Sequence, residues 1–162
     1  MFQRLWERRR EEGGFTLIEL MVVVLIIGIL IAIALPTFLG ARSRAQDKAA
    51  TSDLRNALAT AKTFFTDNDC YDCTTTDFTS TTAAAIEPNL KWAGAGDPGT
   101  TGNTAIVAIT SNSVLMVRKS DSGTYFCAYD STSGTKIAKD TAATSAYANV
   151  DTLAECQALP QA

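Results

Sequence analysis

The sequence predicts an α+β fold in which one long N-terminal α-helix packs on a small antiparallel β-sheet. Three features of the 162-residue chain support this prediction. An apolar run near the N-terminus continues without a break into a polar segment that has helical periodicity. Strand-like segments, separated by turn-forming residues, follow in the C-terminal half. A sheet of three strands with one apolar face needs a covering layer, and the amphipathic part of the helix supplies it.

The helix is expected from Phe15 to about Thr66, and its first half is apolar on every face. No side chain between Leu20 and Leu35 is polar, so this half must lie in a membrane or in the core of an assembly. As a helix, Phe15–Leu39 would be about 37 Å long, which exceeds the roughly 30 Å core of a bilayer. We therefore expect residues 15–42 to form a transmembrane or filament-core helix.

The second half of the helix, residues 43–66, is expected to pack one face on a globular head that comprises residues 43–162. Apolar side chains recur here at spacings of three and four, which is the pattern of an amphipathic helix. They are Leu54, Ala57, Leu58, Ala61, Phe64 and Phe65. The polar run Asp67-Asn68-Asp69 then predicts the end of the helix.

The rest of the head is expected to contain a variable loop, a meander and a C-terminal loop. Residues 67–103 are rich in Thr, Asp, Gly and Pro and predict a surface loop with a short helix from Ser80 to Glu87. The antiparallel sheet is expected at residues 104–130. Its predicted strands are Thr104–Thr110, Ser113–Lys119 and Thr124–Asp130. Residues 131–162 are polar, and we expect them to be weakly structured.

The composition argues against several classes of function. The chain has no histidine, which removes His-based acid–base catalysis and His metal ligands. A formal net charge of −3 does not favour general nucleic-acid binding. The sequence also has no Gly-rich phosphate loop and no convergent acidic pair. We therefore expect that the protein is not an enzyme, needs no cofactor and has no sequence-specific nucleic-acid partner.

A single carboxylate, Glu19, lies near the start of the apolar run. Placing it inside a membrane segment costs roughly 3 kcal/mol, so such a residue indicates a function that needs a partner. No Lys or Arg lies within a helical turn or two of it in the run. A cut between Gly14 and Phe15 would create an α-amine four residues from Glu19. That amine could neutralise Glu19 within one chain, or the amine of a neighbouring chain could do so in an assembly.

Two simpler interpretations of the N-terminus remain open at this point. One is an ordinary secretory signal peptide cleaved near Leu39-Gly40-Ala41, and the other is a simple membrane anchor. Neither explains Glu19, nor the acidic Glu11-Glu12 followed by Gly13-Gly14 directly before the apolar run.

The stretch "GGFTLIELMVVVLIIGILIAIALPTF" closely resembles the class III leader and N-terminal helix of bacterial type IV pilins. The resemblance extends from Gly13 to about Ala45. It implies that residues 1–14 are a leader peptide, that a prepilin peptidase cuts after Gly14, and that the new amine of Phe15 is methylated. It also implies that Glu19 pairs with the N-terminus of a neighbouring subunit during filament assembly.

The resemblance further implies a type IV pilin-like fold and a structural function. The precursor would lie in the inner membrane, and the mature chain would form a homopolymeric helical filament outside the cell. The implied partners are the prepilin peptidase, an inner-membrane assembly platform and ATPase motors. Adhesion, twitching motility and DNA uptake are the usual outputs of the family. The main alternative is a pseudopilin of a type II secretion system, which shares the N-terminal pattern; a membrane-anchored binding module would instead predict an uncut leader and monomers.

Gly28 and Pro36 weaken the apolar helix between them. Glycine costs about 1 kcal/mol relative to alanine inside a helix, and proline about 3 kcal/mol. Pro36 also removes one backbone donor. Because the matching stretch often loses helical order in assembled pili of the family, we expect residues 28–36 to melt in a filament. A harmless kink in a membrane helix is the simpler interpretation.

The four cysteines are interpreted as structural, because the apolar N-terminal segment predicts an oxidising destination. A Cys127–Cys156 bond would close a loop with little core of its own and stabilise the head by about 3 kcal/mol. It would also match the disulfide-bounded C-terminal loop that the resemblance implies. Cys70 would then pair with Cys73, although the crossed pairings remain open. A redox role for this pair is disfavoured because it follows a helix rather than starting one.

Four aspartates, Asp67, Asp69, Asp72 and Asp77, cluster close to this pair. Carboxylate oxygens suit calcium, but the spacing does not match a twelve-residue EF-hand loop. A solvated acidic loop is the favoured interpretation, so we expect no metal site.

Overall fold

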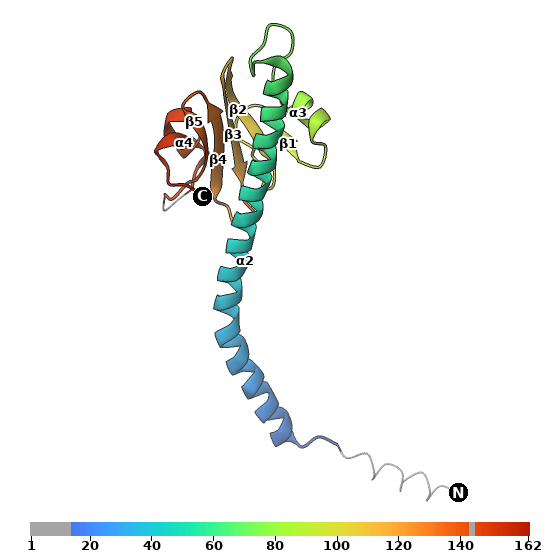
Figure 1. Cartoon of the computed structure of the whole chain (residues 1–162). Helices are drawn as coiled ribbons and strands as arrows, with labels where there is room; N and C mark the ends of the chain where they lie inside the picture. Colours follow the sequence, from blue (N-terminus) through green and yellow to red (C-terminus); the bar gives the residue numbers. More distant parts are fainter. Residues whose placement is uncertain (1–13, 143–144) are drawn as a thin grey trace, which may run out of the picture. The chain divides into compact units, whose positions relative to one another are not determined.

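The computed structural model describes residues 14–142 and 145–162. The chain divides into two compact units, Met1–Ala41 and Arg42–Ala162 (Figure 1). The expected leader lies outside the described residues, except for Gly14.

The long helix α2 comprises Leu17–Asn68, beginning in the first unit and ending in the second. The predicted helix is confirmed, with each end shifted by two residues. It ends at Asn68, where the side-chain Nδ2 donates to the carbonyl oxygen of Phe64 at 2.9 Å. Asp69 follows in the left-handed region with a φ of 58°, which is a common way to terminate a helix.

In the first unit, no described side chain from Gly14 to Ala41 is buried. The side chains of Phe15 and Leu25 are 88% and 62% exposed. This part of α2 has a mean hydropathy of 3.1 over eighteen residues and is long and apolar enough to cross a membrane, by length and composition. The helix continues through Gly28 and Pro36 without a break.

In the second unit, five strands form one sheet in the order β1-β2-β3-β4-β5. The strands are β1 Trp92–Ala93, β2 Thr104–Thr110, β3 Ser113–Lys119, β4 Tyr125–Ser131 and β5 Gly134–Lys139. β1 pairs with β2 in parallel, and all other neighbours pair antiparallel. The three predicted strands are confirmed, the first two to the residue. β1 and β5 were not predicted, since one is only two residues long and the other has a polar sequence.

The C-terminal region is more ordered than the sequence suggests. After β5 come a 3₁₀ turn, η1 Tyr147–Asn149, and a short helix, α4 Leu153–Ala158. The prediction that residues 131–162 are weakly structured is therefore wrong. The side chain of Thr152 caps α4 by accepting from the backbone N–H of Glu155, and the Glu155 carboxylate accepts from the backbone N–H of Thr152. This reciprocal capping box was a readable signal in the sequence.

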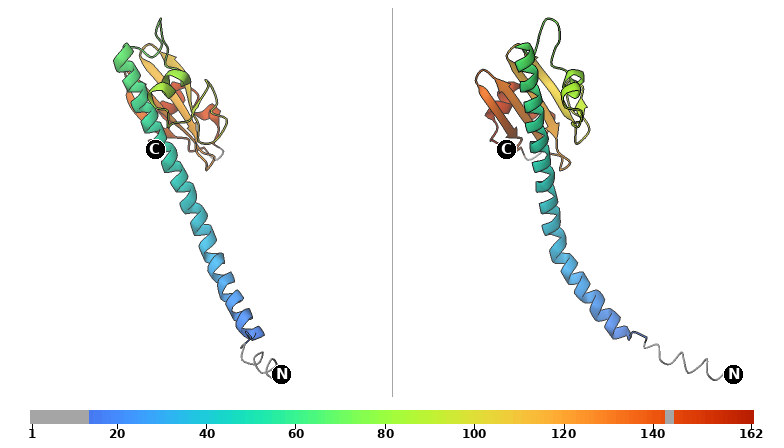
Figure 2. Two further views of the ribbon diagram at one scale, coloured as in Figure 1. Left: turned by 90° about the vertical axis from the view of Figure 1, so that its right-hand side faces the viewer. Right: turned by 45° about the vertical axis from the view of Figure 1, so that its right-hand side comes forward.

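Both faces of the sheet are covered, not one (Figures 1 and 2). Alternate residues of a strand point to opposite faces. On one face, Val114 and Met116 belong to a core that includes Leu54 and Phe64 of α2. On the other, Leu115 and its neighbours form a second core with the C-terminal segment. The other buried residues of this second core are Val117, Tyr125, Cys127, Tyr129, Ala138, Val150 and Cys156.

The loop region before β1 contributes to the first core. Its short helix, α3 Ser80–Ile86, lies where the sequence predicts it. Tyr71 and Phe78 are each 1% exposed and pack against Phe65 and Phe64 of α2. This region is therefore anchored by buried aromatic side chains, whereas the sequence suggested surface exposure throughout.

Candidate assembly and processing site

The carboxylate of Glu19 is held at the start of α2 by Thr16. One oxygen, Oε2, accepts from the backbone N–H of Thr16 at 2.8 Å and from its hydroxyl at 2.6 Å. The backbone N–H of Glu19 donates back to the Thr16 hydroxyl at 3.3 Å. This arrangement is a capping box, and Glu19 is its third helical residue.

Sequence reasoning found Glu19 but missed Thr16. The spacing Thr-x-x-Glu directly before an apolar run is the readable signal of a capping box. Two hydrogen bonds within the chain satisfy one of the two carboxylate oxygens, Oε2. In the described part of the chain, no hydrogen bond to Oε1 accompanies them. The second oxygen of Glu19 is therefore available to a donor from another chain.

Gly14 and Phe15 lie outside the helix, immediately before this capping box. Both are exposed, and a Cβ on Gly14 would meet no heavy atom within 4 Å. The peptide bond between them is thus accessible and precedes the first helical residue, Leu17. A cut there would place a new α-amine within about one helical turn of the Glu19 backbone. The arrangement can therefore bring a cation and a carboxylate together at one helix end.

Gly28 and Pro36 mark the middle of the exposed apolar half. A Cβ on Gly28 would meet nothing within 4 Å, so no contact within the single chain requires glycine there. Near Pro36, the hydroxyl of Thr37 donates to the carbonyl oxygen of Ile33 at 3.4 Å. In the single chain, these residues are compatible with regular helix.

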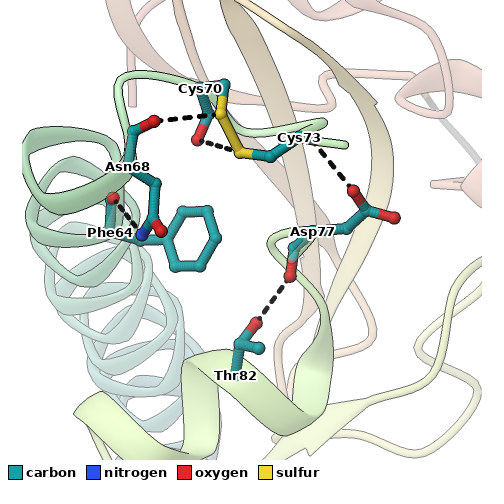
Figure 3. Close-up of a disulfide and its surroundings, with 6 residues drawn as sticks. All are labelled: Phe64, Asn68, Cys70, Cys73, Asp77 and Thr82. Carbon is teal, nitrogen blue, oxygen red and sulfur yellow. Dashed lines mark hydrogen bonds between the residues drawn. A yellow bond between two sulfur atoms is a disulfide. The ribbon is translucent and has the colours of Figure 1, made fainter. Parts of the chain in front are cut away.

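The structure brings together both predicted cysteine pairs, Cys70–Cys73 and Cys127–Cys156. Cys127 and Cys156 are completely buried and join β4 to α4 across the second core. Cys70–Cys73 closes a small surface loop just after α2, where the backbone N–H of Cys73 donates to Asp77 Oδ1 at 3.0 Å (Figure 3). The backbone oxygen of Asp77 in turn accepts from Thr82 Oγ1 at 3.0 Å, which links this loop to α3.

One member of the acidic cluster around this loop, Asp77, has a structural role. Asp77 accepts a backbone hydrogen bond, and Asp67, Asp69 and Asp72 are exposed. Among residues 14–142 and 145–162, no group of three or more acidic or cysteine side chains could hold a metal ion.

Charged contacts tie the second half of α2 to the sheet, and the sequence did not reveal them. Asp47 accepts from Lys139 Nζ at 2.7 Å and from Ser122 Oγ at 2.5 Å. Burial alone would raise the pKa of Asp47, but hydrogen bonds from Lys139 and Ser122 outweigh it and lower the pKa below its ordinary value. Asp53 pairs with the buried guanidinium of Arg118 on β3. Their partners lie many residues away, so no local pattern predicts them.

A further carboxylate, Asp140, organises the segment after β5. It is 3% exposed and accepts from the backbone N–H groups of Ala142 and Ala146 at 2.9 and 3.0 Å. The side chains of Ser145 and Asn149 also donate to it, each at 2.9 Å. Burial acts to raise the pKa of Asp140, but these donors together lower it.

Comparison with known proteins adds to these observations. The family model of the prokaryotic N-terminal methylation motif matches residues 9–35. The type IV wide pilus major component PilA4 of Thermus thermophilus is 36% identical over 121 residues, covering 74% of this chain and 82% of that protein. The type IV major pilin protein PilA of Myxococcus xanthus is 48% identical over 58 residues, covering 36% of this chain and 26% of that protein.

A type II secretion system core protein G, from Pseudomonas aeruginosa, is also similar. It is 39% identical over 67 residues, which cover 41% of this chain and 47% of that protein. The similarity to PilA4 thus extends over most of both chains, whereas the other two cover less than half of each.

Proposed function

The chain belongs to the type IV pilin and pseudopilin family, and we propose that it is a prepilin whose mature form, residues 15–162, polymerises into a type IV pilus. Residues 1–14 would be the leader, removed by a prepilin peptidase that also methylates the amine of Phe15. The precursor would be anchored in the inner membrane by residues 15–42. The mature chain would leave the membrane for the filament through an assembly platform driven by ATPase motors.

The observation that carries this proposal is the exposed apolar helix with one half-satisfied carboxylate at its start. An apolar surface without cover in the single chain needs either lipid or other apolar helices. Glu19 adds specificity, because its Oε2 is bonded to Thr16 and its Oε1 can accept from the amine of a neighbouring Phe15. In the low-dielectric core of a filament, an unpaired carboxylate is costly and a paired one is tolerated. Pairing would therefore favour subunits in correct register.

Gly28 and Pro36 acquire a role in the same proposal. The single chain is helical through both residues, and proline leaves the carbonyl four residues before it without its usual donor. We propose that residues 28–36 lose helical order when the helices are bundled, which would give the filament extensibility. No catalytic residue, metal or cofactor is needed for this structural function.

The experiment that tests the proposal is a mass measurement of the N-terminal peptide from material sheared off cells. A peptide that begins at Phe15 and carries one additional methyl group is expected. A peptide that begins after Ala41 would indicate ordinary secretion, and an uncut N-terminus found only in membranes would indicate a simple anchor. Either result would overturn the proposal.

A pseudopilin of a type II secretion system is the second candidate function, favoured by the similarity to core protein G. The two candidates differ in what deletion of the gene should do. Loss of surface filaments with normal release of secreted proteins supports the pilus, and accumulation of those proteins inside the envelope supports the secretion system. Adhesion, twitching motility and DNA uptake can then be scored separately in the deletion strain.

A further inference from the structure

One edge of the sheet is open along most of its length. β1 pairs only with Thr104 and Ala105, so in the described part of the chain Ile106–Thr110 has no partner strand on that side. An unpaired strand edge presents backbone N–H and C=O groups to any extended segment that can reach them. Natural edges are commonly protected by charged residues, proline or a β-bulge; β2 contains no charged residue and no proline, and has a single bulge at Val107.

A hollow of about 270 Å³ lies along this open edge. Four consecutive residues of β2, Ile106–Ile109, line it together with Phe78, Thr79, Ala95 and Ser80 at the start of α3. Consecutive side chains of a strand point to opposite faces. Ile106 and Ile109 pack with the first core and Val107 with the second, so a hollow that touches all three runs beside the backbone edge and not over one face.

The opposite edge of the sheet is closed by the chain itself. Gln161 forms a bridge with Ala138 of β5. The backbone N–H of Lys139 donates to the carbonyl of Pro160 at 3.2 Å, and that of Ala162 donates to Ile137 at 3.1 Å. The C-terminus thus covers β5, and it cannot cover β2 at the same time.

The lining of the hollow is uncharged, and this favours some occupants over others. None of its lining residues is charged, so the charge-rich leader, with four arginines and three glutamates, is a poor match. Copies of this chain all carry the same net negative charge, −3 for the full sequence, and therefore repel one another in general. The uncharged lining removes this repulsion locally, so a second copy can approach the head here.

We propose that the edge Ile106–Thr110 is an interface between heads, which receives a short extended segment of a second copy as an added strand. This proposal rests on the function proposed above, because only a polymer surrounds each head with copies of itself. Val107 has no partner in register on β3, which makes a bulge in the open edge. A bulge interrupts continuous pairing, so the edge suits a short segment. Backbone hydrogen bonds would supply affinity, and the uncharged hollow would supply selectivity.

The test compares hydrogen exchange of the full chain in detergent with that of assembled filaments. Among the amides of Ile106–Thr110, those that point away from β3 are expected to exchange at least tenfold more slowly in filaments, since the others are already hydrogen-bonded within the sheet. Lys139 and Ala162 serve as internal references, since their amides are already hydrogen-bonded within one chain. Equal exchange of the β2 edge in both states would overturn the proposal. A wild-type chain that forms no filaments would instead overturn the proposed function on which it rests.

A matched pair of variants sharpens the test. Ala108→Lys places a charge in the hollow, and Ala154→Lys places the same charge on an exposed position of α4. Both heads are expected to melt like wild type, whereas only Ala108→Lys should reduce filament yield, by fivefold or more. Normal assembly of Ala108→Lys would contradict the proposal. A photo-reactive residue at position 108 should cross-link to a second copy, and capture of a different protein would overturn the choice of occupant.

Discussion

The two halves of α2 differ in whether their apolar side chains are covered by the rest of the chain. The half in the first unit exposes its apolar side chains, as at Leu25, which is 62% exposed. The half in the second unit buries a stripe, as at Leu54, which is fully buried, and adds charged contacts to the sheet. One half is therefore complete only with lipid or other chains, and the other is complete within the fold. The exposed half is thus available for assembly, whereas the buried stripe of the other half stabilises the head, although both lie on one helix.

The largest expected effect comes from Glu19→Gln. The neutral side chain keeps the size of Glu19 but cannot form an ion pair with a neighbouring α-amine, so we expect filaments to be lost. Membrane insertion and the melting temperature of the head should be unchanged, because among the described residues the Glu19 carboxylate is hydrogen-bonded only to Thr16. Electron microscopy of sheared material and thermal unfolding in detergent measure the two properties. Wild-type filament yield would contradict the proposed role of Glu19.

The disulfides provide the largest expected effect on the head alone. Removing Cys127–Cys156, with a sequence separation of 29, by a double change to Ser should lower the free energy of unfolding by about 3.5 kcal/mol. The same change at Cys70–Cys73, with a separation of 3, should cost about 2 kcal/mol, because it closes a shorter loop. Chemical denaturation of the two double variants measures the difference. Equal losses would show that loop entropy does not govern their contributions.

A matched pair of leucine truncations tests the contrast within α2 directly. Leu54→Ala leaves a cavity in the first core and should destabilise the head by about 3 kcal/mol. Leu25→Ala removes the same atoms from an exposed position, so the head should unfold as in wild type while filament assembly weakens. Denaturation of both variants, with filament yield scored in parallel, makes the comparison. Equal destabilisation of the head by both variants would contradict the proposed difference between the two halves of α2.

The smallest expected effect is a pH dependence at Asp47. Its folded pKa is lowered, so its ionised form favours the folded head. This contribution is complete above the unfolded pKa of about 3.9 and is lost as the pH falls through the lower folded value. The Asp47 side chain is partly exposed, so the effect should stay below about 1 kcal/mol.

Lys139→Gln should shrink this acid-dependent loss, because it removes one cause of the low pKa. Unfolding measured from pH 6 down to the onset of acid denaturation, for both chains, gives the difference. An undiminished acid dependence in Lys139→Gln would show that other carboxylates dominate, such as Asp140 with its four donors.

Local patterns predicted much of this fold. The apolar stripe from Leu54 to Phe64 and the strands Thr104–Thr110 and Ser113–Lys119 were readable because the periods of helix and strand repeat in the sequence. β5 and α4 were missed, although the capping box of Thr152 and Glu155 was visible. Their burial depends on β4 and on Cys127, which is remote in sequence. A polar segment becomes ordered there because a neighbouring strand and a disulfide hold it.

For the candidate site, the sequence by itself determined the residues of the helix start. Gly14, Phe15 and Glu19 lie close together in the sequence, so their spacing alone was enough to propose them. Only the tertiary structure decided which carboxylates tie α2 to the sheet and which sheet edge is left open. Those features depend on contacts between segments far apart in the chain. Such contacts form only when buried surface and backbone hydrogen bonds have fixed the register of the strands.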